Sequence, residues 1–273
     1  MQTRSEAVGR AVLYGSLSKL LLPPDEETAG AIRCGRIGDE LEAALAILPG
    51  APRGRAERIW LFARDTEDPE ARYFRAFDHA LVGTAPPFET EYSGSEPFLR
   101  TNDLGDVAGF YSAWGLRARG VKERPDHIGV EAEFMSFLAQ KEAAAPDLVP
   151  SGIVAPCEDS GAVARRASAG GLRPPERGGV RGGASGSEPP PRSMEDLVGL
   201  CTRAADRFLV EHLGGFAPFY AERFARAARD ALYVEVVRLL ADVVTWDMKR
   251  RGIEAEHRHR SAPVVVGVAG GEA

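Results

Sequence analysis

The residues best suited to chemistry lie in the segment KERPDHIGVEAEFMSFLAQKE, residues 122–142, where Glu123, Asp126 and His127 stand at the start of an expected helix. Asp126 has the residue type of a helix N-cap, which accepts a hydrogen bond from an unpaired backbone N–H and stabilises the helix by about 1 kcal/mol. His127 is then an exposed residue of the first turn. Alternatively, the three side chains form a charged rim where a basic peptide docks, because carboxylates pair well with an arginine guanidinium. Capping is the commoner role at this position, and both interpretations stay open.

The histidines do not form a metal or catalytic pattern. Only the last two lie close together, in a charged C-terminal segment, and the full set is His79, His127, His212, His257 and His259. A catalytic metal site needs three ligands on rigid elements, and no HExxH or similar pattern is present. We therefore expect no metal and no cofactor. The alternative is a helical metal- or nucleotide-binding enzyme that uses Asp126 and His127.

Other reactive motifs are also missing from the sequence. It contains neither the GxSxG of a nucleophile elbow nor a phosphate-binding GxxxxGK[ST]. Its cysteines, Cys34, Cys157 and Cys201, are widely spaced and include no CxxC, so they encode neither a disulfide framework nor a zinc site. These absences favour a protein that is not an enzyme.

The bulk properties restrict the partners and the location. The 273 residues carry a net charge of −6, which argues against nucleic acid because phosphate binding needs clustered Lys and Arg. The apolar residues near the N-terminus are interrupted every few positions by polar ones, unlike a signal peptide or a membrane span. We expect a cytoplasmic protein without stable membrane association.

Apolar residues recur at helical spacing along most of the chain. In the first half, a helix is expected to end at Pro23-Pro24, a short helical segment to follow, another helix to run from Ile37 to Leu48, and one more to start after Asp68-Pro69. Later helices are expected around Leu104–Trp114, from Asp126 to the alanines before Pro146, from Leu197 to a C-cap pair at Gly214-Gly215, and along Tyr233–Val244 as the longest helix. No strand-rich region is present. The fold class is therefore all-α, a compact antiparallel helical bundle.

Composition divides the chain into four parts. Residues 1–145 form an N-terminal helical part that contains the Glu123 to His127 motif. Residues 146–193 are rich in Gly, Pro and Arg and hold no aromatic residue, which predicts a flexible insertion that cannot bury enough surface to offset its ordering entropy. Residues 194–256 supply the C-terminal helices that complete the bundle, and residues 257–273 are expected to be a disordered tail.

Several segments together resemble one known family. ERPDH fits the E-x-x-D-H pattern of the TorD/NarJ family, which matures molybdenum enzymes of the dimethyl sulfoxide reductase class. PPFETEYSGSEPF resembles the family's Pro-Pro-aromatic-Glu loop, and FLVEHLGGFAPFYAERF resembles its penultimate region. The resemblance covers most of residues 8–250 in order, and the 146–193 insertion is its main departure. A long hinge of this kind permits an exchange of helices between two copies in a homodimer.

The resemblance implies a TorD-like bundle that acts as a chaperone. Such a protein binds the apo catalytic subunit of a molybdoenzyme, often through its twin-arginine signal peptide, until molybdopterin is inserted, and it delays export. The implied client-binding residues are Glu123, Asp126 and His127 in the motif, with Phe88, Glu89 and Tyr92 beside the groove. We expect the double substitution of Asp126 and His127 by alanine to weaken client binding without unfolding the bundle. A persistent accessory subunit of the delta type is the alternative.

Overall fold

The computed structural model describes residues 3–82, 85–93, 100–118, 124–145, 172–173 and 193–255. Its helices are α1 (Arg4–Leu21), α2 (Glu26–Arg33), α3 (Arg36–Ile47), α4 (Ala56–Arg64), α5 (Pro69–Val82), the 3-10 turn η1 (Glu89–Glu91), α6 (Arg100–Ala113), α7 (Ile128–Ala144), α8 (Met194–Phe208), the π-helical turn η5 (Leu209–Leu213), α9 (Gly214–Ala227) and α10 (Ala231–Arg251). The predicted all-α bundle is confirmed.

Local signals explain most of the helix ends. α1 begins with a capping box in which Thr3 and Glu6 satisfy each other's backbone N–H groups, and it ends just before Pro23-Pro24. α10 begins at the N-cap Asp230 and ends at Gly252, whose φ of 68° lies in the left-handed region that favours glycine. With 21 residues α10 is the longest single α-helical element among the described residues, as the sequence predicts; only the joined elements α8, η5 and α9 run further.

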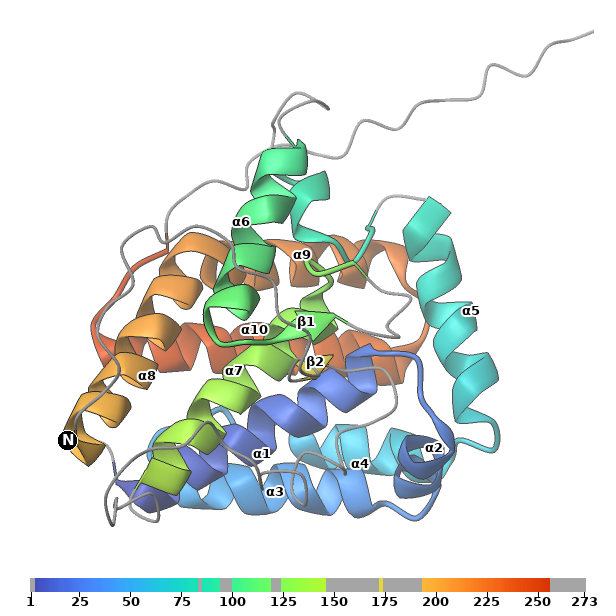
Figure 1. The fold of residues 1–273 in the computed structure, drawn as a ribbon. Coiled ribbons are helices and arrows are strands. Elements are labelled where there is room, and N and C mark those ends of the chain that lie inside the picture. Colours follow the sequence, from blue (N-terminus) through green and yellow to red (C-terminus); the bar gives the residue numbers. More distant parts are fainter. Residues whose placement is uncertain are drawn as a thin grey trace, which may run out of the picture.

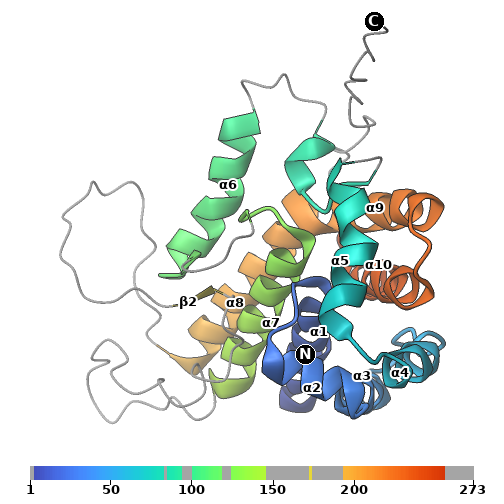
Figure 2. The same cartoon turned by 90° about the vertical axis from the view of Figure 1, so that its right-hand side faces the viewer.

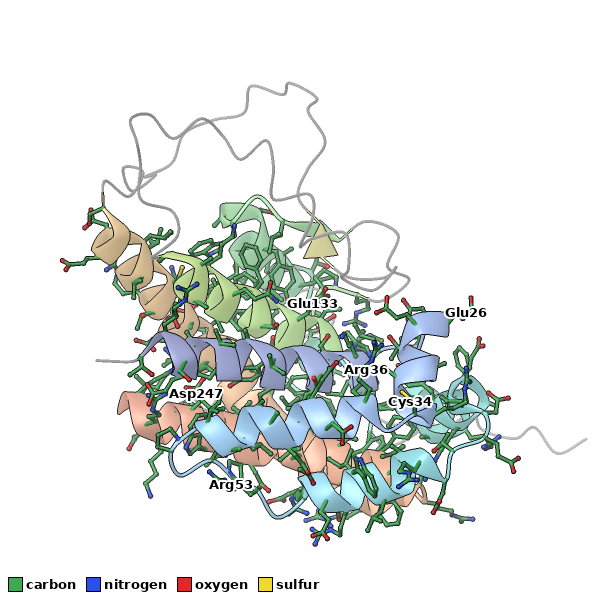
Figure 3. All side chains as sticks on the ribbon, turned by 90° about the horizontal axis from the view of Figure 1, so that it is seen from below. Glu26, Cys34, Arg36, Arg53, Glu133 and Asp247 are labelled. Atoms are coloured by element: carbon green, nitrogen blue, oxygen red, sulfur yellow. The ribbon has the colours of Figure 1, made fainter. Side chains whose placement is uncertain are left out.

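The bundle is built around α1. This helix packs between α7 and α3, while α10 lies against α9, α4 and α1 (Figures 1 and 2). Seen from below, α1 runs between α7 and α3, and Asp247 of α10 lies close to it (Figure 3). Asp247 is fully buried, accepts a hydrogen bond from Tyr14 of α1 and pairs with Arg251, which also reaches Asp206 of α8. Helices from both sides of residues 146–193 therefore share one core.

The glycine pair at 214–215 does not end a helix, which corrects the C-cap prediction. α8 passes through the π-helical turn η5 directly into α9. Gly214 has an ordinary right-handed φ of −64°, so a positive φ is not the reason for glycine here. A Cβ at Gly214 would lie 2.2 Å from the carbonyl oxygen of Leu209 and 2.5 Å from Sδ of Met248, so this position needs glycine for close packing.

The continuous helix carries a row of buried rings at every fourth residue, formed by Phe208, His212, Phe216, Tyr220 and Phe224. The π-helical turn adds one residue to a helical turn, so the row keeps facing the core across the junction. We call this set the α8–α9 ring row. It meets different parts of the N-terminal half along its length.

One small ladder accompanies the helices. The two-residue strand β1 (Arg117–Ala118) pairs antiparallel with β2 (Leu172–Arg173), which belongs to the predicted 146–193 insertion. Apart from Ser193, which is the N-cap of α8, the rest of that insertion and the predicted 257–273 tail lie outside the described residues. None of the described helices has the length and apolar character needed to cross a bilayer.

Candidate functional site

The two predicted client-binding segments, the Pro-Pro loop and the E-x-x-D-H motif, meet at the start of α7. Phe88 and His127 form an antiparallel bridge between the Pro-Pro loop and the motif. On either side of it, the Glu89 N–H donates to the Asp126 carbonyl at 2.9 Å, and the Ile128 N–H donates to the Pro87 carbonyl at 2.9 Å. The loop at residues 85–92 is thereby fastened to the N-terminus of α7.

Asp126 is the centre of this junction and is fully buried. Its Oδ2 accepts hydrogen bonds from the Thr90 N–H at 3.1 Å and the Thr90 hydroxyl at 2.7 Å. Arg124 donates from Nε to Oδ1 at 3.0 Å and from Nη2 to Oδ2 at 2.7 Å. The interpretation of Asp126 as the N-cap of α7 is wrong, because its carboxylate accepts hydrogen bonds from Thr90, which lies 36 residues earlier in the chain.

His127 is the N-cap instead. Its Nδ1 accepts a hydrogen bond from the Gly129 N–H at 3.1 Å, and the residue is 2% exposed. Burial, and after it the positive charge of Arg124, lower the pKa of His127 to about 3. The ring is therefore neutral at physiological pH, which leaves Nδ1 free to accept. The expectation of an exposed first-turn histidine is wrong.

The exposed edge of the junction consists of other residues. The Arg124 guanidinium stacks over the Phe88 ring, 4.5 Å from its centroid, and 38% of the Arg124 side chain is exposed. The Glu91 carboxylate accepts a hydrogen bond from Arg124 at 3.0 Å and another from Arg100 at 2.8 Å. Two residues of the predicted acidic rim, Asp126 and His127, are therefore buried, whereas Phe88, Glu91, Arg100 and Arg124 are partly exposed. Glu123 lies outside the described residues.

Glu89 and Tyr92 belong to the loop, and their side chains are buried between it and the C-terminal helices. The Glu89 carboxylate is 3.1 Å from Nδ1 of His212 in the π-helical turn, and both residues are buried. The Tyr92 hydroxyl donates to the Pro86 carbonyl at 2.7 Å, and its ring packs against Phe216 of α9. Burial raises the pKa of Tyr92 above its usual value. These two residues tie the loop to the C-terminal helices.

Sequence reasoning missed a buried glutamate in α7. Glu131 is fully buried one turn after His127. Burial, and then the negative charges of Glu89 and Asp126, raise the pKa of Glu131 well above its usual range. The sequence signal that could have predicted this burial is the position of Glu131, four residues after His127 on the inward face of α7.

Substituting Glu131 with glutamine is expected to stabilise the protein most at alkaline pH. The folded-state pKa of Glu131 is raised, so its contribution to stability is complete below the unfolded pKa near 4.5 and is lost as pH rises toward the folded pKa. The loss for one proton is about 1.4 kcal/mol per pH unit. Urea unfolding of both proteins at pH 5 and pH 8 measures it.

The comparison isolates the site of Glu131 because the titrations of groups that do not interact with it cancel between the two proteins. His127 changes the stability with pH in the opposite direction. Its contribution to the free energy of unfolding is complete above pH 6.5 and is lost as pH falls toward 3. Glu57→Gln, at an exposed position on α4, is the matched control. An advantage of Glu131→Gln that is the same at both pH values would contradict the raised pKa.

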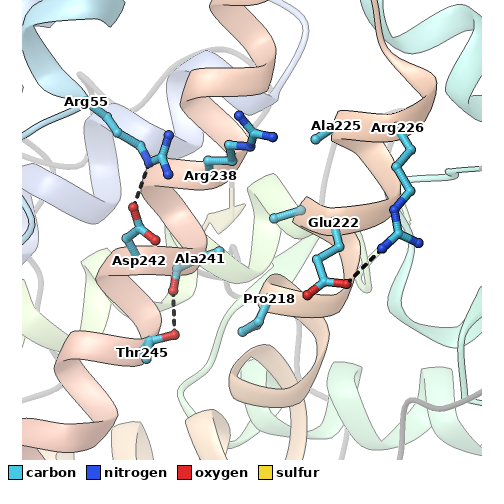
Figure 4. A pocket seen from close by; sticks show the side chains of 10 residues that line it. Arg55, Pro218, Glu222, Ala225, Arg226, Arg238, Ala241, Asp242 and Thr245 are labelled. Carbon is cyan, nitrogen blue, oxygen red and sulfur yellow. Dashed lines mark hydrogen bonds and ion pairs between the residues drawn. The ribbon is translucent and has the colours of Figure 1, made fainter.

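The structure also contains a surface pocket of about 410 Å³ between α9 and α10 (Figure 4). None of the predicted site residues lines it. Two of its arginines are paired within the groove, Arg55 with Asp242 at 2.7 Å and Arg226 with Glu222 at 3.4 Å. In the described part of the chain, no group of three His, Cys, Asp or Glu residues is arranged to hold a metal ion.

The fold and the junction together define a class: an all-helical bundle in which a Pro-Pro-Phe-Glu loop is fastened to an Asp-His helix start. Residues 56–158 match the family described as nitrate reductase delta subunit, and this span contains both halves of the junction. Over these residues the chain is similar to the TorD/NarJ-type family of molybdoenzyme maturation chaperones, which supports the resemblance seen in the sequence. Neither the curated proteins nor the solved structures gave a match.

Proposed function

We propose that this chain is a cytoplasmic chaperone that binds the apo catalytic subunit of a dimethyl sulfoxide reductase-class molybdoenzyme. It holds that subunit, and its twin-arginine signal peptide, until molybdopterin is inserted, and so delays export. The observation that carries the proposal is the fastened loop, in which buried polar groups hold the partly exposed Phe88 and Arg124 at the edge of the junction. The family match to residues 56–158 supports it.

The exposed edge has the chemistry to bind a peptide and release it. Phe88 offers an apolar ring, while Arg124, Arg100 and Glu91 offer charges in partly exposed ion pairs. Exposed pairs contribute little to stability, so an incoming peptide can replace one partner at small cost. An arginine of a leader peptide can pair with Glu91 in this way. A complex of roughly micromolar affinity, about 8 kcal/mol, suits a chaperone that must let go.

The predicted client-binding residues then have two different roles. Phe88 contacts the client directly, and Arg124 joins it. Glu89, Tyr92, Asp126 and His127 position that edge from inside the bundle, because each is buried and hydrogen bonded. Glu123 remains a predicted contact.

Substituting Phe88 with alanine is expected to weaken binding of a leader peptide about tenfold, because the aromatic contact is removed while the buried junction stays intact. Calorimetry is the measurement, with leader peptides from nitrate, selenate, chlorate, sulfoxide and hydrocarbon-oxidising molybdoenzymes as probes. Phe74→Ala is the matched control, because Phe74 is a half-exposed phenylalanine on α5. Equal weakening by both substitutions, or a wild type that binds none of the peptides and no apo subunit, would contradict the proposal.

A second candidate is a persistent accessory subunit of the reductase, favoured by the description of the matching family as a delta subunit. Copurification separates the two functions. A chaperone is recovered with the molybdopterin-free catalytic subunit and is lost when the cofactor is loaded. A subunit remains in the loaded, active enzyme.

A further inference from the structure

Helix α6 is poorly supported by its own sequence. Strong helix formers hold few of its positions, Arg100, Leu104, Ala108 and Ala113. Glycine, among the least favourable residues in a helix, occupies the interior positions 105 and 109. A Cβ at either glycine would meet nothing within 4 Å, and neither has a positive φ, so packing and backbone geometry do not account for them. The intrinsic helix stability of α6 is therefore lower than its packing would allow, because alanine would fit at both glycine positions.

α6 lies on a bed of aromatic rings. The Phe110 ring is 5.3 Å from Phe208 and 5.1 Å from His212, and the Tyr111 ring is 4.9 Å from Phe134. Trp114, just after α6, lies 6.0 Å from Phe137. We call Phe134, Phe137, Phe208 and His212 the aromatic bed. If α6 leaves, this surface of α7, α8 and the π-helical turn is uncovered.

The attachment of α6 to the bundle is limited. α6 stands on the outside in both views (Figures 1 and 2), and within it only Val107 and Tyr111 are fully buried. Helices with few buried side chains open locally at much lower free energy than the core. The free energy needed to open α6 locally is therefore far lower than the free energy needed to unfold α1, α7 or α10.

The aromatic bed is continuous with the candidate site. His212 of the bed contacts Glu89 of the loop, and the Tyr111 hydroxyl donates to the Pro125 carbonyl at 2.8 Å, next to Asp126. A segment bound at Phe88 and Arg124 can therefore extend onto the bed. The bed also specifies what fits, because Phe110 and Tyr111 of α6 and Trp114 just after it, at i, i+1 and i+4, cover it with aromatic rings.

We propose that α6 is an exchangeable helix, which leaves the aromatic bed so that an apolar helical segment of the immature client can take its place. The proposal rests on the chaperone function proposed above. The occupant must present apolar side chains at the spacing that α6 presents, in the manner of helix-in-groove recognition. The apolar stretch of a leader peptide can do so.

Stabilising α6 without touching the bed tests the exchange. The substitutions Gly105→Ala and Gly109→Ala together favour the helix and meet no neighbouring atom. They are expected to weaken binding of the leader peptides about tenfold, because the more stable helix must still be displaced. Gly30→Ala is the matched control, since Gly30 also lies inside a helix, α2, with nothing within 4 Å of a Cβ. It should leave the affinity unchanged.

Opening α6 should have the opposite effect. Ala108→Pro removes a backbone donor in the middle of α6 and is expected to strengthen peptide binding several-fold. A labelled synthetic peptide of residues 100–114 that carries the two alanines should also bind to the Ala108→Pro protein more tightly than to the wild type. Circular dichroism verifies that the rest of the bundle stays folded.

The α6 peptide separates failure of this inference from failure of the chaperone function. Leader peptides that bind wild type and the double-alanine variant equally overturn the exchange, whatever the function. An α6 peptide that binds all three proteins equally also overturns it. A dimer of the Ala108→Pro protein, detected by sedimentation and dispersed by the α6 peptide, would make a second copy the occupant and would overturn the client as occupant.

Discussion

Substituting Gly214 with alanine is expected to lower the free energy of unfolding by roughly 3 kcal/mol. The new Cβ would lie 2.2 Å from the Leu209 carbonyl oxygen, which is backbone and cannot rotate away, and 2.5 Å from Sδ of Met248. The junction between η5 and α9 must therefore shift, and His212 with it. Urea unfolding of the two proteins, followed by circular dichroism, measures the loss.

Gly30→Ala is the control for the Gly214 result. It places the same methyl group inside a helix with no neighbour within 4 Å, and it is expected to stabilise the protein slightly. Equal stability changes at the two positions would contradict the close packing at the π-helical turn. A loss at Gly214 only supports it.

Substituting Asp126 with alanine is expected to lower the free energy of unfolding by a similar amount, roughly 3 kcal/mol. The change leaves Thr90 and Arg124 without the acceptor that now receives four hydrogen bonds. Arg124 is partly exposed and can turn to water, so the loss is smaller than for a fully buried pair. Thermal and urea unfolding measure it.

A double-mutant cycle with Thr90→Ala distinguishes this role from helix capping. If Asp126 holds the loop, the two substitutions are coupled, because the second one removes a partner that the first has already freed. A pure cap would give a loss of about 1 kcal/mol and no coupling to Thr90. It follows that the Asp126 and His127 double substitution changes stability as well as any client binding. A variant at Phe88 is the cleaner test.

Much of the architecture could be predicted because its signals are local. Pro23-Pro24, Asp68-Pro69 and the cationic end of α10 mark helix ends by the chemistry of one or two residues. The apolar spacing that predicts α1, α3 and α7 also selects the buried faces of these helices. These features require no knowledge of which elements touch.

The site was harder to predict because its partners are distant in sequence. Asp126 and His127 both have side chains that can cap a helix, and only the arrival of Thr90 decides which one does so. The resemblance identified the loop and the motif as parts of one site but carried no information on exposure, so Asp126 and His127 were expected at the surface although both are buried. The wrong C-cap prediction at Gly214 has the same cause. A glycine pair suits a helix end or a close contact equally well, and here the proximity of Met248 in α10 requires the close contact.

The α8–α9 ring row has a mechanical consequence. Its rings touch three regions of the N-terminal half in succession: Phe208 lies 4.9 Å from Phe134 of α7, Phe216 lies 5.6 Å from Tyr92 of the loop, and Phe224 lies 5.3 Å from Phe77 of α5. One helix, continued through the π-helical turn, carries all three contacts, so a displacement of the loop at Tyr92 acts on the same helix that packs against α7 and α5.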